Sequence, residues 1–182
     1  MSEILGEPAS DRLTAIEDFL RSRGAEGMPH PGGTLLQHLI RVRERLAEWG
    51  TDWDVQVAGL CHAAYGTDGF APSLMDVAER AVLLDVIGAR AEELVYLYAS
   101  CDRGVTYPRL GTERRPVFRD RFTRVEFDPG EGDLRAFLAV TAANEFDVFE
   151  HNAELRRQYE AGLVRMLRRV AGLLPRAVAT TL

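Results

Sequence analysis

Three histidines carry most of the chemistry that this sequence offers. His30 and His38 lie at the two ends of the segment His-Pro-Gly-Gly-Thr-Leu-Leu-Gln-His, and His62 follows His38 by 24 residues. An imidazole ring has an ordinary pKa of about 6.5, so it can give or take a proton near neutral pH, and it can also bind a metal ion. The pattern therefore indicates a site around His38 and His62, and it leaves the reaction open.

Two predicted helices position these rings. The apolar spacing predicts a helix over 34–49, with Thr34 as its N-cap and His38 inside its apolar stripe. A second helix is expected over 52–65, with His62 near its end. The connection between them is short, which favours antiparallel neighbours. His38 and His62 should then lie at the same end of the pair and face one cavity.

The remaining apolar patterns predict an all-α fold in one domain that spans residues 1–182. Residues 103–130 are the least helical part, and within them a small β-hairpin over 117–127 is an open alternative. The helices that we expect besides the first two cover residues 11–23, 74–87, 89–102, 133–152 and 153–174. The last of these has an apolar face that suits packing and leaves a homodimer possible.

Composition excludes several classes of function. The net charge of −6 argues against a nucleic-acid partner, because phosphate contacts need an excess of basic residues. Every basic residue is Arg, which removes lysine nucleophiles and suggests a GC-rich bacterial genome. Cys61 and Cys101 have no metal-knuckle spacing and should be reduced core thiols. No stretch is long and apolar enough for a membrane span, so we expect a cytoplasmic protein.

The order of these residues resembles the HD-domain superfamily, in which a histidine on one helix is followed by a histidine-aspartate pair and a distal aspartate. His38 matches the first histidine, His62 matches the histidine of the pair, and residues 142–147 match the distal region. The chain is more closely similar to an uncharacterised HD-like family of bacteria, fungi and plants. That likeness rests on His-Pro-Gly-Gly-x-Leu-Leu-x-His, on His-x-x-Tyr-Gly-Thr at 62–67, and on Cys-Asp-Arg at 101–103.

The resemblance implies an HD-like helical bundle, but two of its metal positions have lost their charge. Ala63 stands where the paired aspartate would be, and Asn144 stands at the distal position. Two neutral imidazoles and an amide would leave the charge of a divalent metal poorly compensated in a buried site. We therefore expect a degenerate metal site and no cofactor. A divalent Fe, Mn or Zn ion remains open, with His38, His62 and Asp147 as its ligands.

Three hypotheses for function follow. The first is a small-molecule enzyme with hydrolase, lyase or isomerase chemistry, in which histidine acts as general acid or base on a carbonyl- or hydroxyl-bearing substrate. The second is a metal-dependent phosphohydrolase or iron oxygenase of HD type, and the third is a non-catalytic small-molecule-binding protein. The candidate catalytic residues are His38, His62, Tyr65 and Asn144. The candidate substrate-binding residues are His30, Asp68, Phe70, Asp102, Arg103 and Asp147.

Overall fold

The computed structural model describes residues 9–70, 72–113 and 116–182. Its helices are α1 (Ala9–Ser22), α2 (Leu35–Glu48), α3 (Trp53–Cys61), α4 (Arg80–Ile87), α5 (Ala89–Ser100), α6 (Arg103–Arg109), α7 (Glu131–His151), α8 (Ala153–Arg169) and α9 (Arg176–Ala179), with 3-10 turns η1 (Val77–Glu79) and η2 (Ala171–Leu173). Two antiparallel hairpins accompany them: β1 (Pro29–His30) with β2 (Gly33–Thr34), and β3 (Phe118–Arg119) with β4 (Glu126–Phe127). The expected mostly helical fold with a small hairpin within 117–127 is confirmed.

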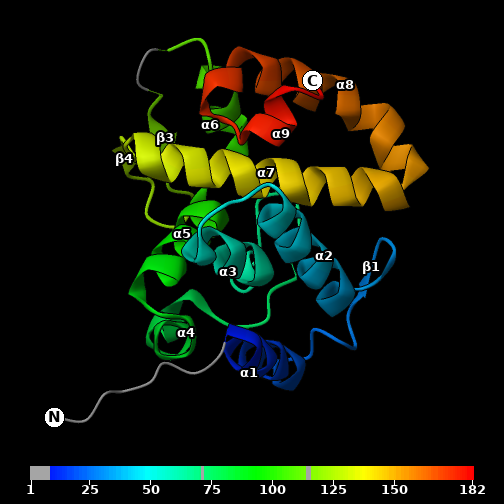
Figure 1. Cartoon of the computed structure of the whole chain (residues 1–182). Helices are drawn as coiled ribbons and strands as arrows, with labels where there is room; N and C mark the ends of the chain where they lie inside the picture. Colours follow the sequence, from blue (N-terminus) through cyan, green and yellow to red (C-terminus); the bar gives the residue numbers. More distant parts are fainter. Residues whose placement is uncertain (1–8, 71, 114–115) are drawn as a thin grey trace, which may run out of the picture.

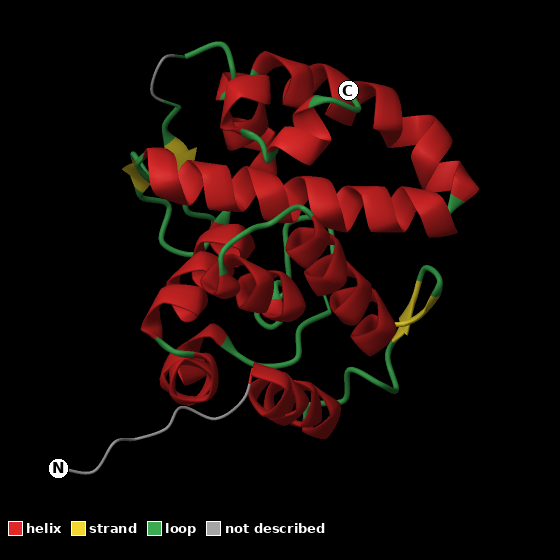
Figure 2. Cartoon of the chain, viewed as in Figure 1, coloured by secondary structure: helices red, strands yellow, loops and turns green. Residues whose placement is uncertain are grey.

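Helix α7 divides the molecule into two groups of helices. Figure 1 shows α2, α3 and α5 along one side of α7, with α4 and α1 beyond them, and α6, α8 and α9 along the other side. Figure 2 shows how little of the chain is strand, since both hairpins lie at the margins of the helical body. Helix α7 is buried along most of its length, from Leu134 to Phe149. A side chain on this helix can therefore meet groups from either side.

The helix that carries His38 begins as its sequence predicts. The Thr34 hydroxyl accepts a hydrogen bond from the Gln37 backbone N–H, and the Gln37 side chain accepts one from the Thr34 N–H. This reciprocal capping fixes the first turn of α2. The preceding segment forms the β1–β2 hairpin, whose turn is Pro31-Gly32. A Cβ on Gly32 would lie 2.5 Å from Cδ2 of His151, so only glycine allows the hairpin to pack this closely.

Two expected helix boundaries near the site were wrong, and one short helix was not expected. Helix α3 ends at Cys61 rather than Tyr65 because the His62 ring bonds to the Gly59 carbonyl, which a further helical turn would use. The helix expected from residue 74 starts at Arg80, after the 3-10 turn η1 that Asp76 caps. The short helix α6 was not expected, because Pro108 and a glycine interrupt its pattern; Asp102 caps its start.

The apolar core lies on both sides of the site. One cluster joins α1, α2, α3, α4 and α5, and the other joins α2, α5, α7 and α8. Cys61 and Cys101 are free and buried, as expected, and burial raises the pKa of each thiol to about 12. Among the described residues, none of the helices combines the length and the apolar character that crossing a bilayer would require.

Candidate functional site

His38 is held from both ring nitrogens. Its Nδ1 lies 2.7 Å from Oδ2 of Asp147, and its Nε2 lies 2.9 Å from Oδ1 of Asn144. The Asn144 amide is oriented by its own Nδ2, which donates to Oε1 of Glu145. Both ring nitrogens of His38 are thus occupied by neighbouring side chains, which leaves neither of them for a ligand.

Asp147 is the buried carboxylate beside His38. It is fully buried, and Arg41 donates to both of its carboxylate oxygens, from Nε at 2.7 Å and from one terminal nitrogen at 2.9 Å. Burial alone would raise the pKa of Asp147, but the hydrogen bonds from His38 and Arg41 outweigh burial and hold it well below its ordinary value. Asp147 is therefore a permanent carboxylate that bonds to both His38 and Arg41.

The three histidine rings meet, as the sequence predicted for His38 and His62. The His38 and His62 centroids are 5.2 Å apart in an edge-to-face arrangement, and His30 stacks on His38 with centroids 4.0 Å apart. Phe70 in turn packs edge-on against His30 at 5.4 Å. His38 thus contacts both other imidazoles, with His30 stacked on it and His62 edge-to-face with it. It is the innermost ring and has no exposed surface.

His62 is the ring best placed for proton chemistry. Its Nδ1 lies 2.8 Å from the Gly59 carbonyl oxygen, which is only an acceptor, so Nδ1 carries the proton and Nε2 keeps a lone pair. Burial, followed by the nearby His38, lowers the pKa of His62 to about 3. The ring is therefore neutral at cellular pH, and its Nε2 can accept a hydrogen bond from a ligand.

His30 is neutral for similar reasons. Burial, and then His38, lower its pKa to about 4. Its Nδ1 is buried and has no hydrogen-bond partner among the described residues. A buried polar atom without a partner costs stability, so its presence in a site requires an explanation.

A cavity of about 770 Å³ opens beside His30 and His62. Its walls come from the hairpin β1–β2, the segment after α3, and helices α6, α7 and α8. Most of the lining is apolar. Residues on its walls include His30, His62, Phe70, Arg103, Tyr107, Asn144 and Glu145, with Gly162 and Arg169 on α8.

Arg103 and Glu145 form the charged part of this wall. One terminal nitrogen of Arg103 donates to Oε1 of Glu145 at 3.1 Å, and the other donates to the Tyr98 hydroxyl at 3.0 Å. The guanidinium lies over both the Tyr98 and Tyr107 rings, at 5.5 and 5.7 Å from their centroids. The Tyr107 hydroxyl is buried without a hydrogen-bond partner in the described part of the chain. This wall therefore offers an unused donor beside a neutralised ion pair.

Several predicted residues lie outside the cavity. Tyr65 is buried, and its hydroxyl donates at 2.7 Å to Glu92, which also pairs with Arg80. This hydrogen bond holds the segment after α3 against α5. Asp102 caps α6, and Asp68 accepts a hydrogen bond from the Arg103 backbone N–H. These three residues support the site from outside it.

Sequence reasoning missed the groups that complete the site. Arg41, Glu145 and Tyr107 were not named, and α8 was assigned to packing although Tyr159 and Leu163 on it line the cavity. A usable signal existed for Arg41, because it lies three residues after His38 and so shares its helix face. Tyr107 had no such signal, since α6 itself was not expected.

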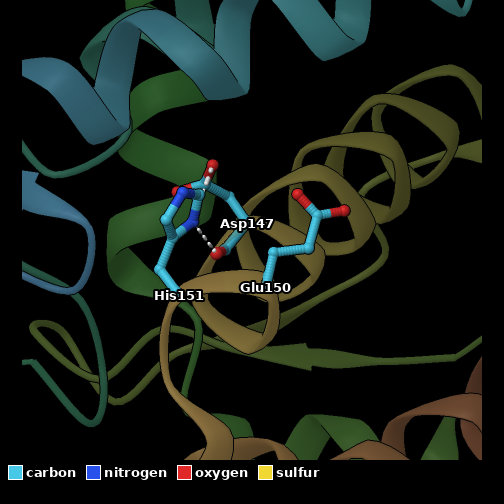
Figure 3. A group of neighbouring side chains, drawn as sticks. All are labelled: Asp147, Glu150 and His151. Carbon is cyan, nitrogen blue, oxygen red and sulfur yellow. Dashed lines mark hydrogen bonds and ion pairs between the residues drawn. The ribbon is translucent and has the colours of Figure 1, made fainter.

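A metal ion could be held by a different group from the expected one. The ligand atoms of Asp147, Glu150 and His151 lie within 4.8 Å of one another, and within the described ranges this is the group of three that meets such a limit. Figure 3 shows dashed interactions between His151 and Asp147 and none from Glu150. Asp147 is already neutralised by Arg41, and Arg45 pairs with Glu150 at 2.6 Å. A metal would have to displace both arginines, so the donor set fits a metal poorly.

The unpartnered tyrosine gives a stability test of the site. We expect Tyr107→Phe to raise the free energy of unfolding by about 1 kcal/mol, because the substitution removes a buried hydroxyl that lacks a partner. The control is Tyr65→Phe, which removes a donor to the buried Glu92 and should lower it by about 1–3 kcal/mol. Urea unfolding measures both. A loss of stability in both variants would contradict the unpartnered state of Tyr107.

Comparison with known proteins gives a family without an assigned role. Residues 19–103 match the model of a family described as "Domain of unknown function (DUF6817)". This part of the chain includes the three histidines and ends at Arg103, so the similarity covers the histidine side of the site and leaves out α7 and α8. No curated protein and no solved structure matches the chain.

Proposed function

We propose that the protein is a small-molecule enzyme that moves a proton on a hydroxyl- or carbonyl-bearing substrate, with an HD-like helical fold whose metal site has degenerated. The observation that carries the proposal is the set of unused polar atoms around one cavity. Tyr107 offers a hydroxyl donor, His62 offers the lone pair of Nε2, and His30 offers an unpartnered Nδ1. A ligand that bonds to these atoms would remove their cost of burial.

In this proposal His62 is the general base. Its Nε2 accepts a proton from a substrate hydroxyl or from a carbon next to a carbonyl, while the Gly59 carbonyl holds Nδ1–H and fixes the ring. Negative charge then develops on the substrate oxygen, and the Tyr107 hydroxyl is the donor on the same wall that can stabilise it. The same imidazolium returns the proton to another atom or to a leaving group, which gives isomerisation or elimination.

The low pKa of His62 is compatible with this role. The ring resists protonation from solvent, because burial and the nearby His38 lower its pKa. When the proton comes from the substrate, an anion forms beside the new imidazolium and compensates its charge. His38 and Asp147 are positioning residues here, because they fix the ring against which His62 packs.

The test is substrate discovery with a matched variant. Purified protein is incubated with a neutral metabolite extract, and mass spectrometry records which compounds change. We expect His62→Gln to slow the change by about 10²–10⁴-fold, the range for removal of a general base, with the fold retained by circular dichroism. The control Asp133→Asn alters an ion pair on the surface and should react as the wild type does. Equal turnover by wild type and His62→Gln would reject the proposal.

The second candidate is a metal-dependent enzyme with Asp147, Glu150 and His151 as ligands, which requires that the metal displace Arg41 and Arg45 from the two carboxylates. Elemental analysis of protein purified without chelator separates the two candidates. Stoichiometric Fe, Mn or Zn that is lost in Glu150→Gln, together with turnover that requires the metal, would favour this second candidate.

A further inference from the structure

We infer that the end of the substrate that reaches the histidines is uncharged, and that Glu145 sets this selectivity. The inference rests on the proposed function, since it concerns the ligand of the same cavity. It excludes carboxylates and phosphates at that end, and it favours an amphipathic molecule whose polar end is a hydroxyl or a ketone.

The charge of Arg103 is already matched by Glu145, whose carboxylate accepts from the guanidinium at 3.1 Å. A substrate anion that approached Arg103 would also approach Glu145, which lines the same wall. Because the surroundings are largely apolar, repulsion between two anions is weakly screened there.

The polar groups beside the histidines add no cation to the wall, and Arg169, which lines the cavity from α8, already donates from Nε to the Leu110 carbonyl oxygen. His62 presents a lone pair on Nε2, which repels an anion and accepts from a hydroxyl. His38 is enclosed by Asp147, Asn144 and the neighbouring rings, and it does not line the cavity. Asn144 already uses its amide to bridge His38 and Glu145. The polar end is thus suited to hydrogen bonding without net charge.

A pair of fluorescent probes tests this selectivity. N-phenyl-1-naphthylamine is neutral, and 8-anilinonaphthalene-1-sulfonate is the same skeleton with one sulfonate. We expect the wild type to bind the neutral probe at least tenfold more tightly. In Glu145→Gln, whose Oε1 can still accept from Arg103, affinity for the sulfonate should rise at least fivefold while affinity for the neutral probe stays within twofold.

Two controls separate the possible failures. Asp133→Asn removes a carboxylate from the same helix outside the cavity and should keep the wild-type ratio of affinities. Gly162→Phe narrows the cavity from α8, where an added Cβ meets only the tip of Arg165 at 4.0 Å, and should weaken both probes tenfold or more. Arg169 also lines the cavity. It is present in both the wild type and Glu145→Gln, so its effect cancels when the ratios of affinities of the two proteins are compared.

The outcomes are distinct. A ratio that changes in Glu145→Gln and not in Asp133→Asn supports the inference. A ratio that stays constant in Glu145→Gln, while Gly162→Phe still weakens binding, overturns the inference and leaves the proposed function standing. If Gly162→Phe weakens neither probe, the cavity does not take ligands, and the proposed function fails together with the inference.

Discussion

Asp147→Ala should lower the free energy of unfolding by about 3–5 kcal/mol. The substitution removes the acceptor of two buried or partly buried donors at once, because the His38 ring and the Arg41 guanidinium both bond to this carboxylate. Breaking a buried ion pair from one side leaves the other charge without compensation, and that cost is of this size. Urea unfolding, with the denaturant slope fitted for each protein, measures the loss.

A matched carboxylate on the same helix provides the control. Asp133 also pairs with an arginine, Arg90 at 2.6 Å, but both side chains are substantially exposed to solvent. Asp133→Ala should therefore cost at most about 1 kcal/mol, which is typical of a surface pair. If the two variants lost equal stability, Asp147 would not be the buried anion on which the histidine cluster depends.

The same residue shows where sequence reasoning ends. The helical stripes and the short connection were enough to bring His38 and His62 together, because periodicity and chain reversal are local properties. Asp147 lies 109 residues from His38, and only the path of α7 between the two helix groups places it behind the ring. Asp147 was expected as a ligand if a metal were bound, and in the structure its carboxylate accepts hydrogen bonds from His38 and Arg41.

The cavity was harder still to predict. Part of its wall comes from α8, whose apolar pattern in the sequence is typical of ordinary helix packing. Another part comes from α6, whose helical pattern is interrupted by a glycine and Pro108. Periodicity tells which face of a helix is buried, but it does not tell whether that face meets a side chain or a space. Tyr65 shows a second kind of error. It lies three residues after His62 and was expected in the catalytic site, but its hydroxyl donates to Glu92.

Acid should weaken the protein well above the pH at which carboxylates titrate. Between pH 7 and pH 5 we expect the free energy of unfolding to fall by about 2–3 kcal/mol, mostly through His62. Its folded pKa is about 3, whereas the unfolded chain has the ordinary value of about 6.5, so at pH 5 the unfolded state binds a proton that the folded state refuses. His30, with a folded pKa of about 4, adds less because its ring is partly exposed.

The sign of this effect separates the histidines from Asp147. A carboxylate with a lowered pKa stabilises the fold at every pH above its ordinary value of about 3.8, so Asp147 contributes no change between pH 7 and pH 5. Urea unfolding at the two pH values measures the loss, and His62→Gln should remove at least half of it, since glutamine does not titrate. If the wild type were equally stable at pH 7 and pH 5, His62 would not be a buried neutral ring, and its Nε2 would not be held ready to accept a proton from a substrate.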